Sequence, residues 1–453
     1  MKKTKIHPYI IIILSFLGII LLGTIALVMP FATNDFHSIG FVDSLFMSTS
    51  AVCVTGLSVV NVGVDFNLYG RIVMVILMEI GGLSFITIAI FFYTIIGAKI
   101  GVSNRFLLRE ALNQSSVSGL ITLVRKIVVI SFAVQIVCAG INMIVFIKFY
   151  DTWWEALGAS LFHSASAFNN AGFDIFGGIG SDSLIKFKDD ILINMTTIAM
   201  IILGSAGFVV LDDMFKKKFK WKKFTLHSKL AITTTAILII GGTIFIKATV
   251  RPAQGEEAFS WLQALFGSVT CRTAGFTTYD LSNLAKYPGA YICYVILMLI
   301  GASPCGTGGG VKTTTIAVVI IAIVFYARGK SARAFGRKIS NDQIFKAFVL
   351  IGMCVLIIVF GTFMVSIVQT DRSWAHGEFG FQEILFEVAS AFSTTGLSMG
   401  ITGNLNAGSR IILCFIMFFG RLGPLTIIGV VNKNWLGASK EEIQYVEENV
   451  IIG

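Results

Sequence analysis

Long apolar runs constrain the fold of this chain more than any other feature of its sequence. Each run is long enough to cross about 30 Å of hydrocarbon as a helix that rises 1.5 Å per residue. Only 13% of the 453 residues are charged, against about 25% in an ordinary soluble domain, so a water-soluble globule is excluded. The runs lie at 9–29 and near 72–96, 125–148, 190–211, 230–248, 290–325, 344–368 and 409–431. The sequence therefore predicts an all-α polytopic membrane protein with eight transmembrane spans.

The sequence disfavours both a secretory signal at the N-terminus and a framework of disulfides or zinc-binding cysteines. Lys2, Lys3 and Lys5 precede the first apolar run, as in a secretory signal, but the run is longer than the 7–15 apolar residues of such signals. The seven cysteines stand singly in apolar stretches without a C-x-x-C pair, so neither a disulfide framework nor a zinc site is expected.

A fourfold internal repeat organises the chain. Between the two spans of each pair lies a segment that is too short and too rich in Gly, Ser and Thr to cross a membrane: Phe41–Val60, Trp153–Phe176, Phe259–Thr278 and Phe379–Gly400. Each segment begins with helical apolar spacing and ends in a similar hexapeptide: Val52–Leu57, Phe168–Phe173, Cys271–Phe276 and Phe392–Leu397. Self-similarity at a long fixed period indicates repeated structural units.

A second marker recurs in register with the hexapeptides. The span after each one carries a cluster of small residues: Gly81-Gly82, Gly204–Gly207, Gly301–Pro304, and Gly420 with Gly423-Pro424. Each unit is therefore expected to be a helix, a re-entrant pore loop and a second helix. This gives boundaries at 1–98, 99–215, 216–329 and 330–432, followed by a cytoplasmic tail at 433–453.

The distribution of basic residues predicts the orientation. If both termini are cytoplasmic, most of the 35 Lys and Arg residues fall on the inner side, as the positive-inside rule requires. The hexapeptides then open to the outside, among acidic residues that include Asp174 and Asp182. An acidic outer face would raise the local concentration of cations.

Four non-helical loops inside one membrane protein favour a central pore. Such backbone is tolerated only where it lines water or is buried by protein. The glycine of each loop can adopt conformations that turn carbonyl oxygens inward. Four sets of carbonyls can replace the hydration shell of a monovalent cation. No carboxylate occurs in any hexapeptide, which disfavours a filter for divalent cations.

The four loops on a fourfold repeat resemble the Trk/Ktr/HKT superfamily of potassium transporters, over essentially the whole chain. The length resembles the KtrB branch more than the longer TrkH branch, which stays as the alternative. The resemblance implies potassium uptake and a selectivity filter that holds K⁺ at three residues of each loop. These are Val54, Thr55 and Gly56; Asn170, Ala171 and Gly172; Thr273, Ala274 and Gly275; and Thr394, Thr395 and Gly396. Asn169-Asn170 and Arg272 depart from fourfold symmetry, and Arg272 is expected behind the filter, beside an acidic residue.

The third repeat holds a second candidate element. A helix over 290–325 would be about 54 Å long, so it must break at Gly301–Lys312, which contains five glycines and a proline. In the family the matching segment gates the pore, which implies a gate of Gly301, Gly306, Gly308, Gly309, Gly310 and Lys312 with Arg421. Such a loop should move easily, because it lacks helical hydrogen bonds and side-chain packing. A phosphate-binding loop would need Lys directly after its last Gly, and Val311 intervenes.

Three ionisable residues lie deep in spans: Glu79, Lys312 and Arg421. Each would cost about 2.5–3.5 kcal/mol at a helix centre, so each should face the pore or a partner, and Glu79 could receive Arg421 when the gate opens. The segment Gly396–Gly400 matches the G-x-S-x-G motif of hydrolases, but no strand-to-helix elbow or histidine partner accompanies it. Two alternative functions of a different class are kept: an intramembrane hydrolase and a membrane sensor without a pore.

The resemblance also implies partners. KtrB-like subunits lie in the bacterial plasma membrane as homodimers. They work with a cytosolic RCK-type ring, KtrA- or KtrC-like, that binds ATP or ADP. This chain is therefore expected to bind no nucleotide, to contact no nucleic acid and to be no enzyme. Whether Na⁺ is required, and whether transport is symport, is left open.

Overall fold

The computed structural model describes residues 8–96, 119–250, 259–282, 284–369 and 380–423. Each quarter of the chain repeats one order of helices: a first long helix, a short helix that ends in a loop, and a second helix, which is broken in the first three quarters. The first helices are α1 (Pro8–Val28), α7 (Leu120–Phe146), α11 (Leu226–Thr249) and α15 (Asn341–Val368). The short helices are α2 (Phe41–Val52), α8 (Trp153–Asn169), α12 (Trp261–Thr270) and α17 (Phe381–Ser393). The structure thus has the predicted four helix–loop–helix units.

The second helices follow the loops. They are α4 (Leu68–Leu83) with α5 (Phe85–Ile95), α9 (Ile191–Ser205) with α10 (Phe208–Lys216), α13 (Pro288–Leu299) with α14 (Thr313–Ala327), and α18 (Ala407–Leu422). Short connecting elements are α3 (Val62–Asp65), η1 (Pro30–Ala32), η2 (Phe176–Ile179), η3 (Ile185–Phe187), η4 (Trp221–Lys223), η5 (Leu284–Lys286), η6 (Thr402–Asn404), and the antiparallel pair β1 (Arg333–Ala334) and β2 (Arg337–Lys338).

Local sequence explains where many helices begin. A side-chain oxygen of the residue before the helix accepts a backbone N–H of the first turn, which satisfies a donor that has no partner inside the helix. Ser260 and Gln263 form a reciprocal capping box at the start of α12. The other side-chain caps are Asn61, Asn67, Thr152, Asp190, Thr225, Ser340 and Asn406.

The outer surfaces of the long helices are apolar. Leu22, Ile136, Ile237 and Leu356 are all more than 60% exposed, which is favourable only against hydrocarbon. Within the described residues, four helices, namely α1 and the other three first helices, are long and apolar enough to span a membrane. Up to six spans result there if each bent pair counts as one. The helix α18 covers the described part of the eighth predicted span, and residues 424–431 lie outside the described residues.

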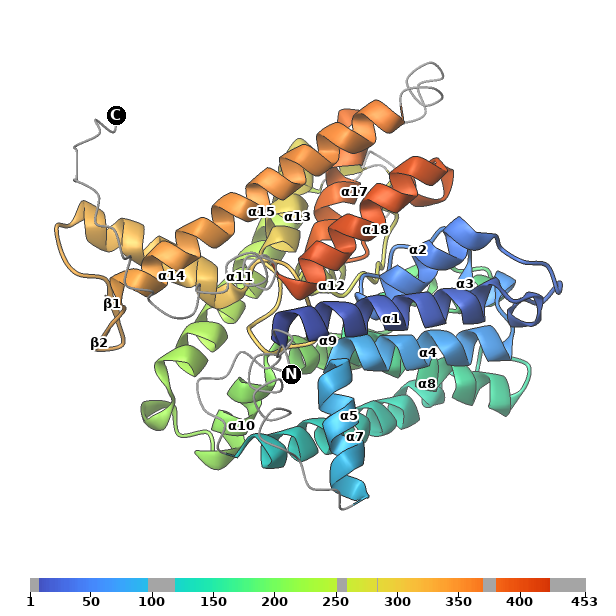
Figure 1. Ribbon diagram of the computed structural model, residues 1–453, viewed down its shortest axis with the longest axis horizontal. Helices are drawn as coiled ribbons and strands as arrows, with labels where there is room; N and C mark the ends of the chain where they lie inside the picture. The colour runs from blue at the N-terminus through green and yellow to red at the C-terminus, as the bar shows by residue number, and fades with distance from the viewer. Residues whose placement is uncertain (1–7, 97–118, 251–258, 283, 370–379, 424–453) are drawn as a thin grey trace, which may run out of the picture.

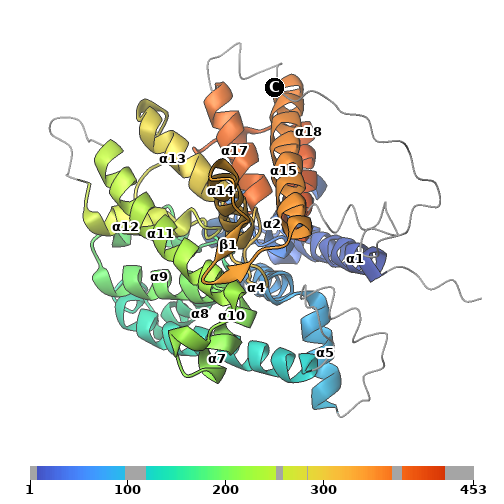
Figure 2. The ribbon, with the colours of Figure 1, turned by 90° about the vertical axis from the view of Figure 1, so that its left-hand side faces the viewer.

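The four units close into a ring. Each first helix packs on its own short helix. The second helix of each unit also packs on the short helix of the next unit: α4 on α8, α9 on α12, α13 on α17 and α18 on α2. Figure 2 shows the four units grouped by colour around a common centre. The four short helices are therefore surrounded by other helices, and their last turns are buried.

The breaks in the second helices correct part of the sequence prediction. Continuous spans were expected over 72–96 and 190–211, but α5 turns by 97° from α4 and α10 turns by 94° from α9, as Figure 1 shows for α4 and α5. The chain turns at Ser84 (φ 70°), two residues after Gly81-Gly82, and at Gly207 (φ 88°), the last residue of the second small-residue cluster; both φ values are positive. A break was foreseen only in the third unit, where the chain is non-helical from Ile300 to Lys312 as predicted.

Candidate functional site

The four loops after the short helices share one backbone conformation. Two residues before each glycine stands a non-glycine residue with positive φ: Val54 (57°), Asn170 (57°), Thr273 (72°) and Thr394 (52°). The glycines are left-handed too, with φ of 91° at Gly56, 71° at Gly172, 83° at Gly275 and 85° at Gly396. The residue between them is not left-handed in any loop. Alternating handedness points successive peptide groups to the same side, as a row of inward carbonyls requires.

Hydrogen bonds to the end of each short helix hold this conformation. The N–H groups of Thr55, Ala171 and Thr395 donate to carbonyls five residues earlier, at 2.8, 2.8 and 2.9 Å, and Ala274 donates to Thr270 O at 2.9 Å. In the first loop Ser50 Oγ also accepts from Gly56 N and donates to Leu57 O. The loops are therefore rigid continuations of the short helices.

The four glycines meet in a closed ring, which we call the glycine ring: Gly56, Gly172, Gly275 and Gly396. A Cβ atom added to Gly172 would lie 3.0 Å from Gly275 Cα and 3.4 Å from Gly56 Cα. One added to Gly275 would lie 3.3 Å from Gly396 Cα, and one added to Gly396 would lie 3.0 Å from Gly56 Cα. Each such Cβ would also press on the carbonyl oxygen before the next glycine, at Thr55, Ala171, Ala274 or Thr395. The structure thus brings together all four loops predicted from the sequence.

The small-residue clusters explain how the ring is supported from outside. Gly81, Gly204 and Gly420 each press against the backbone carbonyl of the residue four before a ring glycine, at Val52, Phe168 and Phe392. A side chain at these positions would push the second helix of the unit away from the end of the short helix. The small-residue clusters therefore allow the second helices to pack closely against the ends of the short helices.

Arg272 differs from its expected environment. Its side chain is 1% exposed. However, no carboxylate pairs with it among the described residues, and its Nε and Nη2 atoms have no hydrogen-bond partner there. The expected acidic neighbour is thus not found among the described residues.

The segment Gly301–Lys312, called loop 301–312 below, lies on the short-helix side of the glycine ring. Gly309 N donates to Thr394 Oγ1 at 3.0 Å, and Gly308 and Gly301 lie against the side chain of Thr273. Thr307 N donates to Gly204 O at 3.1 Å, and Ser303 N donates to Ser205 O at 3.0 Å. The loop is therefore bound to the second, third and fourth units rather than loosely held.

This anchoring changes the physical interpretation of the loop glycines. Gly301 N donates to Val311 O at 2.9 Å and closes the loop on itself, and Gly310 adopts a φ of 66°. An added Cβ on Gly306 would lie 3.0 Å from Ser205 O. The glycines allow the loop to pack closely and to form specific hydrogen bonds. Movement of the loop must break these hydrogen bonds. The loop has no helical hydrogen bonds, as expected, but the expectation that it lacks packing and moves easily was wrong.

Arg421 and Lys312 both bind this region through carbonyl oxygens. Arg421 Nη1 donates to Thr307 O of loop 301–312, and its Nη2 donates to Gly81 O and, at 3.2 Å, to Gly82 O at the end of α4. Lys312 Nζ donates to Gly308 O at 2.8 Å and Gly309 O at 3.3 Å. The structure brings these two cations to the loop as predicted, but Arg421 binds α4 backbone rather than Glu79.

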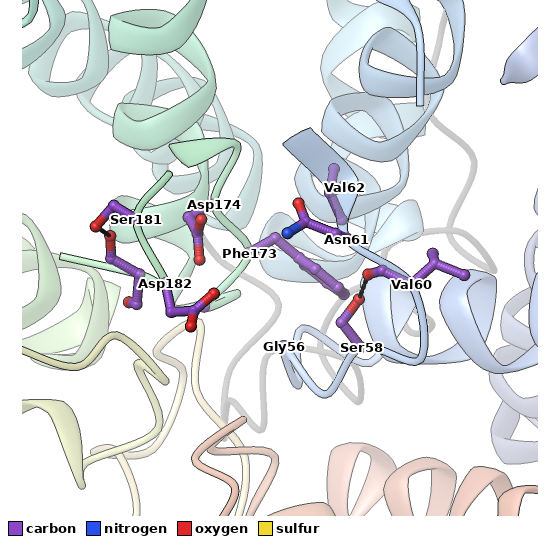
Figure 3. A pocket seen from close by; sticks show the side chains of 11 residues that line it. Gly56, Ser58, Val60, Asn61, Val62, Phe173, Asp174, Ser181 and Asp182 are labelled. Atoms are coloured by element: carbon purple, nitrogen blue, oxygen red, sulfur yellow. Dashed lines mark hydrogen bonds between the residues drawn. The ribbon is translucent and has the colours of Figure 1, made fainter. Parts of the chain in front are cut away.

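A cavity opens on the other side of the glycine ring. Its volume is about 200 Å³, and it lies between the loops of the first two units (Figure 3). It is lined by Gly56, Ser58, Val60, Asn61, Val62, Gly172, Phe173, Asp174, Ser181, Asp182 and Ser183. Figure 3 shows Asp174 and Asp182 on one side and Asn61 on the other. The sequence indicated the acidic residues on this face and the hexapeptide residues Gly56, Gly172 and Phe173, but the serines and residues 60–62 of the lining carry no motif.

Asp174 is the titratable group whose environment is most unusual in this cavity. Burial raises its pKa from 3.8 to about 7, and the nearby charge of Asp182 adds to the shift. Its Oδ1 accepts a hydrogen bond from Phe176 N at 3.0 Å. Its charge therefore changes close to neutral pH.

The hydrolase interpretation finds no support in the geometry of Ser398. Ser398 Oγ accepts from Gly400 N at 3.0 Å and from Thr402 Oγ1 at 3.0 Å. No histidine contacts it among the described residues. These bonds shape the segment after the fourth loop.

Comparisons with known proteins agree with this architecture. A family model described as TrkH, cation transport protein, matches residues 3–434. The potassium/sodium uptake protein NtpJ of Enterococcus hirae is 35% identical, over 100% of this chain and 98% of its own length. The Ktr system potassium uptake protein B of Bacillus subtilis is 34% identical, over 100% of this chain and 98% of its own length.

A solved structure shares the fold. The potassium transporter TrkH from Vibrio parahaemolyticus aligns with a TM-score of 0.71 and 18% identity, over 96% of this chain and 87% of that one. The family match and the full-length relatives lead to one conclusion: the chain belongs to the TrkH family of cation transport proteins.

Proposed function

We propose that this chain is the membrane subunit of a potassium uptake system of the KtrB type, with a pore along the axis of the glycine ring. The observation that carries the proposal is the ring itself: the four loops share one backbone conformation and their glycines meet around one centre. The names of the full-length relatives, which refer to potassium or potassium/sodium uptake, support the choice of ion. A TrkH-like system is the alternative, and a requirement for Na⁺ remains open to measurement.

The selectivity filter in this proposal is the set of twelve loop residues identified from the sequence. The carbonyls of the ring and of the two residues before each glycine face the ion, and their dipoles replace its water. The four short helices end at the same place, so their negative dipole ends point toward the cation. The Oγ1 atoms of Thr55 and Thr273 have no partner among the described residues and are available near this path.

The gate in this proposal is loop 301–312 with Arg421. The loop touches the filter residues Thr273 and Thr394, so it lies where an ion leaving the filter must pass. Arg421 holds it to α4 through Thr307, Gly81 and Gly82. A guanidinium near the path opposes a cation by about 4 kcal/mol at 4 Å and an effective dielectric of about 20. Opening of the gate requires these hydrogen bonds to break and be replaced by others. The gate therefore needs an external driving force to open.

That force is proposed to come from a cytosolic partner. With both termini in the cytoplasm, the inner surface holds the basic loop around 216–223 and the β1–β2 hairpin, whose Arg337 is exposed. The acidic segment 441–448 lies outside the described residues. We propose that an RCK-type ring that binds ATP or ADP covers this surface on a homodimer of the chain. Reversal of charge at Arg333 and Arg337 should weaken co-purification of the ring, and unchanged co-purification at low and moderate salt would count against the surface.

Rubidium flux into vesicles tests the proposed function. Purified protein reconstituted into liposomes should carry ⁸⁶Rb⁺ down its gradient, faster with the cytosolic subunit than without it. A hydrolase or a sealed sensor would leave the vesicles impermeable. Competition by K⁺ and by Na⁺ in the same assay separates a potassium pore from an unselective one.

A further inference from the structure

A second cavity is a groove between α7 and α10. Its volume is about 280 Å³, and both ribbon views show α10 beside α7 (Figures 1 and 2). Each helix contributes one face, because its lining residues are three or four positions apart and so are neighbours on a helix surface. The lining residues are Leu123, Lys126, Ile127 and Ile130 of α7, and Phe208, Leu211, Asp212 and Phe215 of α10. The groove is therefore apolar, with one charged residue from each helix.

The position of the groove indicates that its apolar walls meet the lipid bilayer. The helix α10 turns by 94° from α9, so it runs along the membrane surface where α9 crosses the membrane. It buries Phe208 and Leu211 and ends at Lys216, a pattern typical of helices at the membrane interface. On α7 the groove face continues for two turns beyond Ile130 to Val137, which is 63% exposed. The groove therefore opens onto the outer apolar surface of α7.

Positive charge exceeds negative charge at the edge of the groove. Lys126 Nζ lies 3.0 Å from Asp212 Oδ1, and Lys216 Nζ lies 2.6 Å from Asp212 Oδ2. The next acid, Asp213, pairs with Lys217, so one carboxylate faces the two ammonium groups of Lys126 and Lys216. These two side chains are 44% and 65% exposed, and each ammonium has N–H donors beyond the one that Asp212 accepts. Both lysines can therefore bind a further anion.

We propose that this groove binds one anionic phospholipid of the leaflet that the sequence predicts to be cytoplasmic. The headgroup phosphate accepts hydrogen bonds from Lys126 and Lys216, and an acyl chain lies in the groove and leads toward Val137. Charge complementarity favours an anionic lipid over a zwitterionic one, and basic pockets between helices on this side of a membrane bind such headgroups. A soluble partner would have to leave water to reach the apolar walls, whereas an acyl chain is already beside them.

Phe208 connects the lipid site to loop 301–312. Its side chain lines the groove, and its backbone N–H donates to Cys305 O of the loop at 2.9 Å. The nearby Gly204 O and Ser205 O also accept hydrogen bonds from the loop. A ligand stabilises the conformation that it binds, so the lipid should hold α10, and through it the loop, in the arrangement described here. This step rests on the proposed function, in which that arrangement is the closed gate.

Native mass spectrometry of the purified full-length chain tests the site without reference to transport. The protein in detergent is titrated with phosphatidylglycerol or with phosphatidylcholine of the same acyl chains, and phosphatidylglycerol should bind more tightly. Lys126→Ala and Lys216→Ala change only exposed side chains, so both should fold, and each should weaken phosphatidylglycerol binding about fivefold. Lys346→Ala is the matched control, because Lys346 pairs with Asp342 at 2.8 Å on α15 and does not line the groove. Equal binding of the two lipids, or an equal loss in Lys346→Ala, would overturn the proposal.

Ile130→Trp distinguishes a lipid in the groove from one held at the surface. The larger side chain fills the groove and leaves both lysines in place, so phosphatidylglycerol binding should fall to the level of phosphatidylcholine. Binding at the wild-type level in this variant would mean that the lysines act only as surface charges, and would overturn the groove as the site. If Ile130→Trp instead weakened co-purification of the cytosolic subunit and left lipid binding unchanged, the groove would belong to a protein partner and the proposal would fail.

The transport arm measures ⁸⁶Rb⁺ flux without the cytosolic subunit. In vesicles of equal parts phosphatidylcholine and phosphatidylglycerol, Lys126→Ala should carry about two- to fivefold more flux than the wild type, because a ligand shifts an equilibrium by no more than its difference in affinity. In vesicles of phosphatidylcholine alone the two proteins should agree. Equal flux of the two proteins in both kinds of vesicle would reject the link to the gate. Absence of flux in every protein, with selective lipid binding intact, would reject the proposed function and leave the lipid site standing.

Discussion

The glycine ring and loop 301–312 are both built on glycine, yet glycine serves a different purpose in each. In the ring every glycine is left-handed and touches the backbone of the next unit, so no side chain can be added without moving a neighbouring loop. In loop 301–312 most glycines have ordinary φ values and approach side chains or hydrogen-bonded carbonyls. The ring is therefore held by backbone contacts that recur in all four units. Loop 301–312 occurs in one unit and is held by hydrogen bonds that can be exchanged for others.

Replacement of a ring glycine should have the largest effect. Gly396→Ser adds a Cβ at φ 85° against Thr55 O and Gly56, and the strain of the left-handed conformation alone costs about 1–3 kcal/mol. We expect potassium affinity in a potassium-uptake-deficient cell to fall by about tenfold or more, before expression falls. Equivalent losses are expected at Gly56, Gly172 and Gly275.

Gly403→Ser is the matched control, because it lies after the same loop and no atom lies within 4 Å of an added Cβ. It should keep wild-type affinity. If serine at all four ring positions also kept it, the ring would not be the selectivity filter.

Loss of Arg421 should have the next largest effect, in the opposite direction. Arg421→Ala removes the bonds that join Thr307 to Gly81 and Gly82, and each charge-assisted bond is worth about 1.5–3 kcal/mol. We expect the flux without the cytosolic subunit to rise by about tenfold or more in ⁸⁶Rb⁺ assays with protein amount matched. Arg410→Ala, which removes an arginine of the same helix away from the loop, should not raise it. Equal flux in Arg421→Ala and wild type would reject the gate.

A smaller effect is expected at the cavity outside the ring. Asp174 has a pKa of about 7, so it is neutral below that pH and gains its negative charge as the pH rises through it. An anionic side chain attracts cations, and uptake at limiting K⁺ should therefore increase about two- to threefold from pH 6 to pH 8. Asp174→Asn should flatten this part of the profile, and measurement at low and high salt should show the effect diminishing with screening. An unaltered profile in the variant would assign the titration elsewhere.

The ion pair between Asp43 and Arg410 should give the smallest effect. It joins the first and fourth units, and both side chains are partly exposed, at 27% and 17%. Partly exposed pairs contribute about 1 kcal/mol or less. Asp43→Asn should lower the melting temperature in detergent by a few degrees without a change in ion preference. A large loss of selectivity would mean that the ring depends on this contact.

The sequence was sufficient to predict the repeat and the four loops because both are local patterns. The hexapeptides and the small-residue clusters are read directly from the chain, and the break at Gly301–Lys312 follows from its glycines. The bends at Ser84 and Gly207 were not foreseen, because a small residue permits a turn without requiring one.

Long-range backbone contacts explain the other differences. Arg421 binds carbonyls of Gly81, Gly82 and Thr307, and a carbonyl acceptor is present at every residue, so the sequence offers no signal for it. The same holds for loop 301–312, whose partners are Gly204 O and Ser205 O. Asn169 was noted as a departure from symmetry, but its position against Gly82 depends on how α4 packs on α8.

Anomalous X-ray diffraction from crystals grown in rubidium tests the central claim most directly. The account predicts Rb⁺ density on the axis of the glycine ring, surrounded by the carbonyl oxygens of Thr55, Ala171, Ala274 and Thr395, and weakened when sodium replaces rubidium. Rubidium density that lies away from this axis, or a ring closed to the ion in every condition, would contradict it.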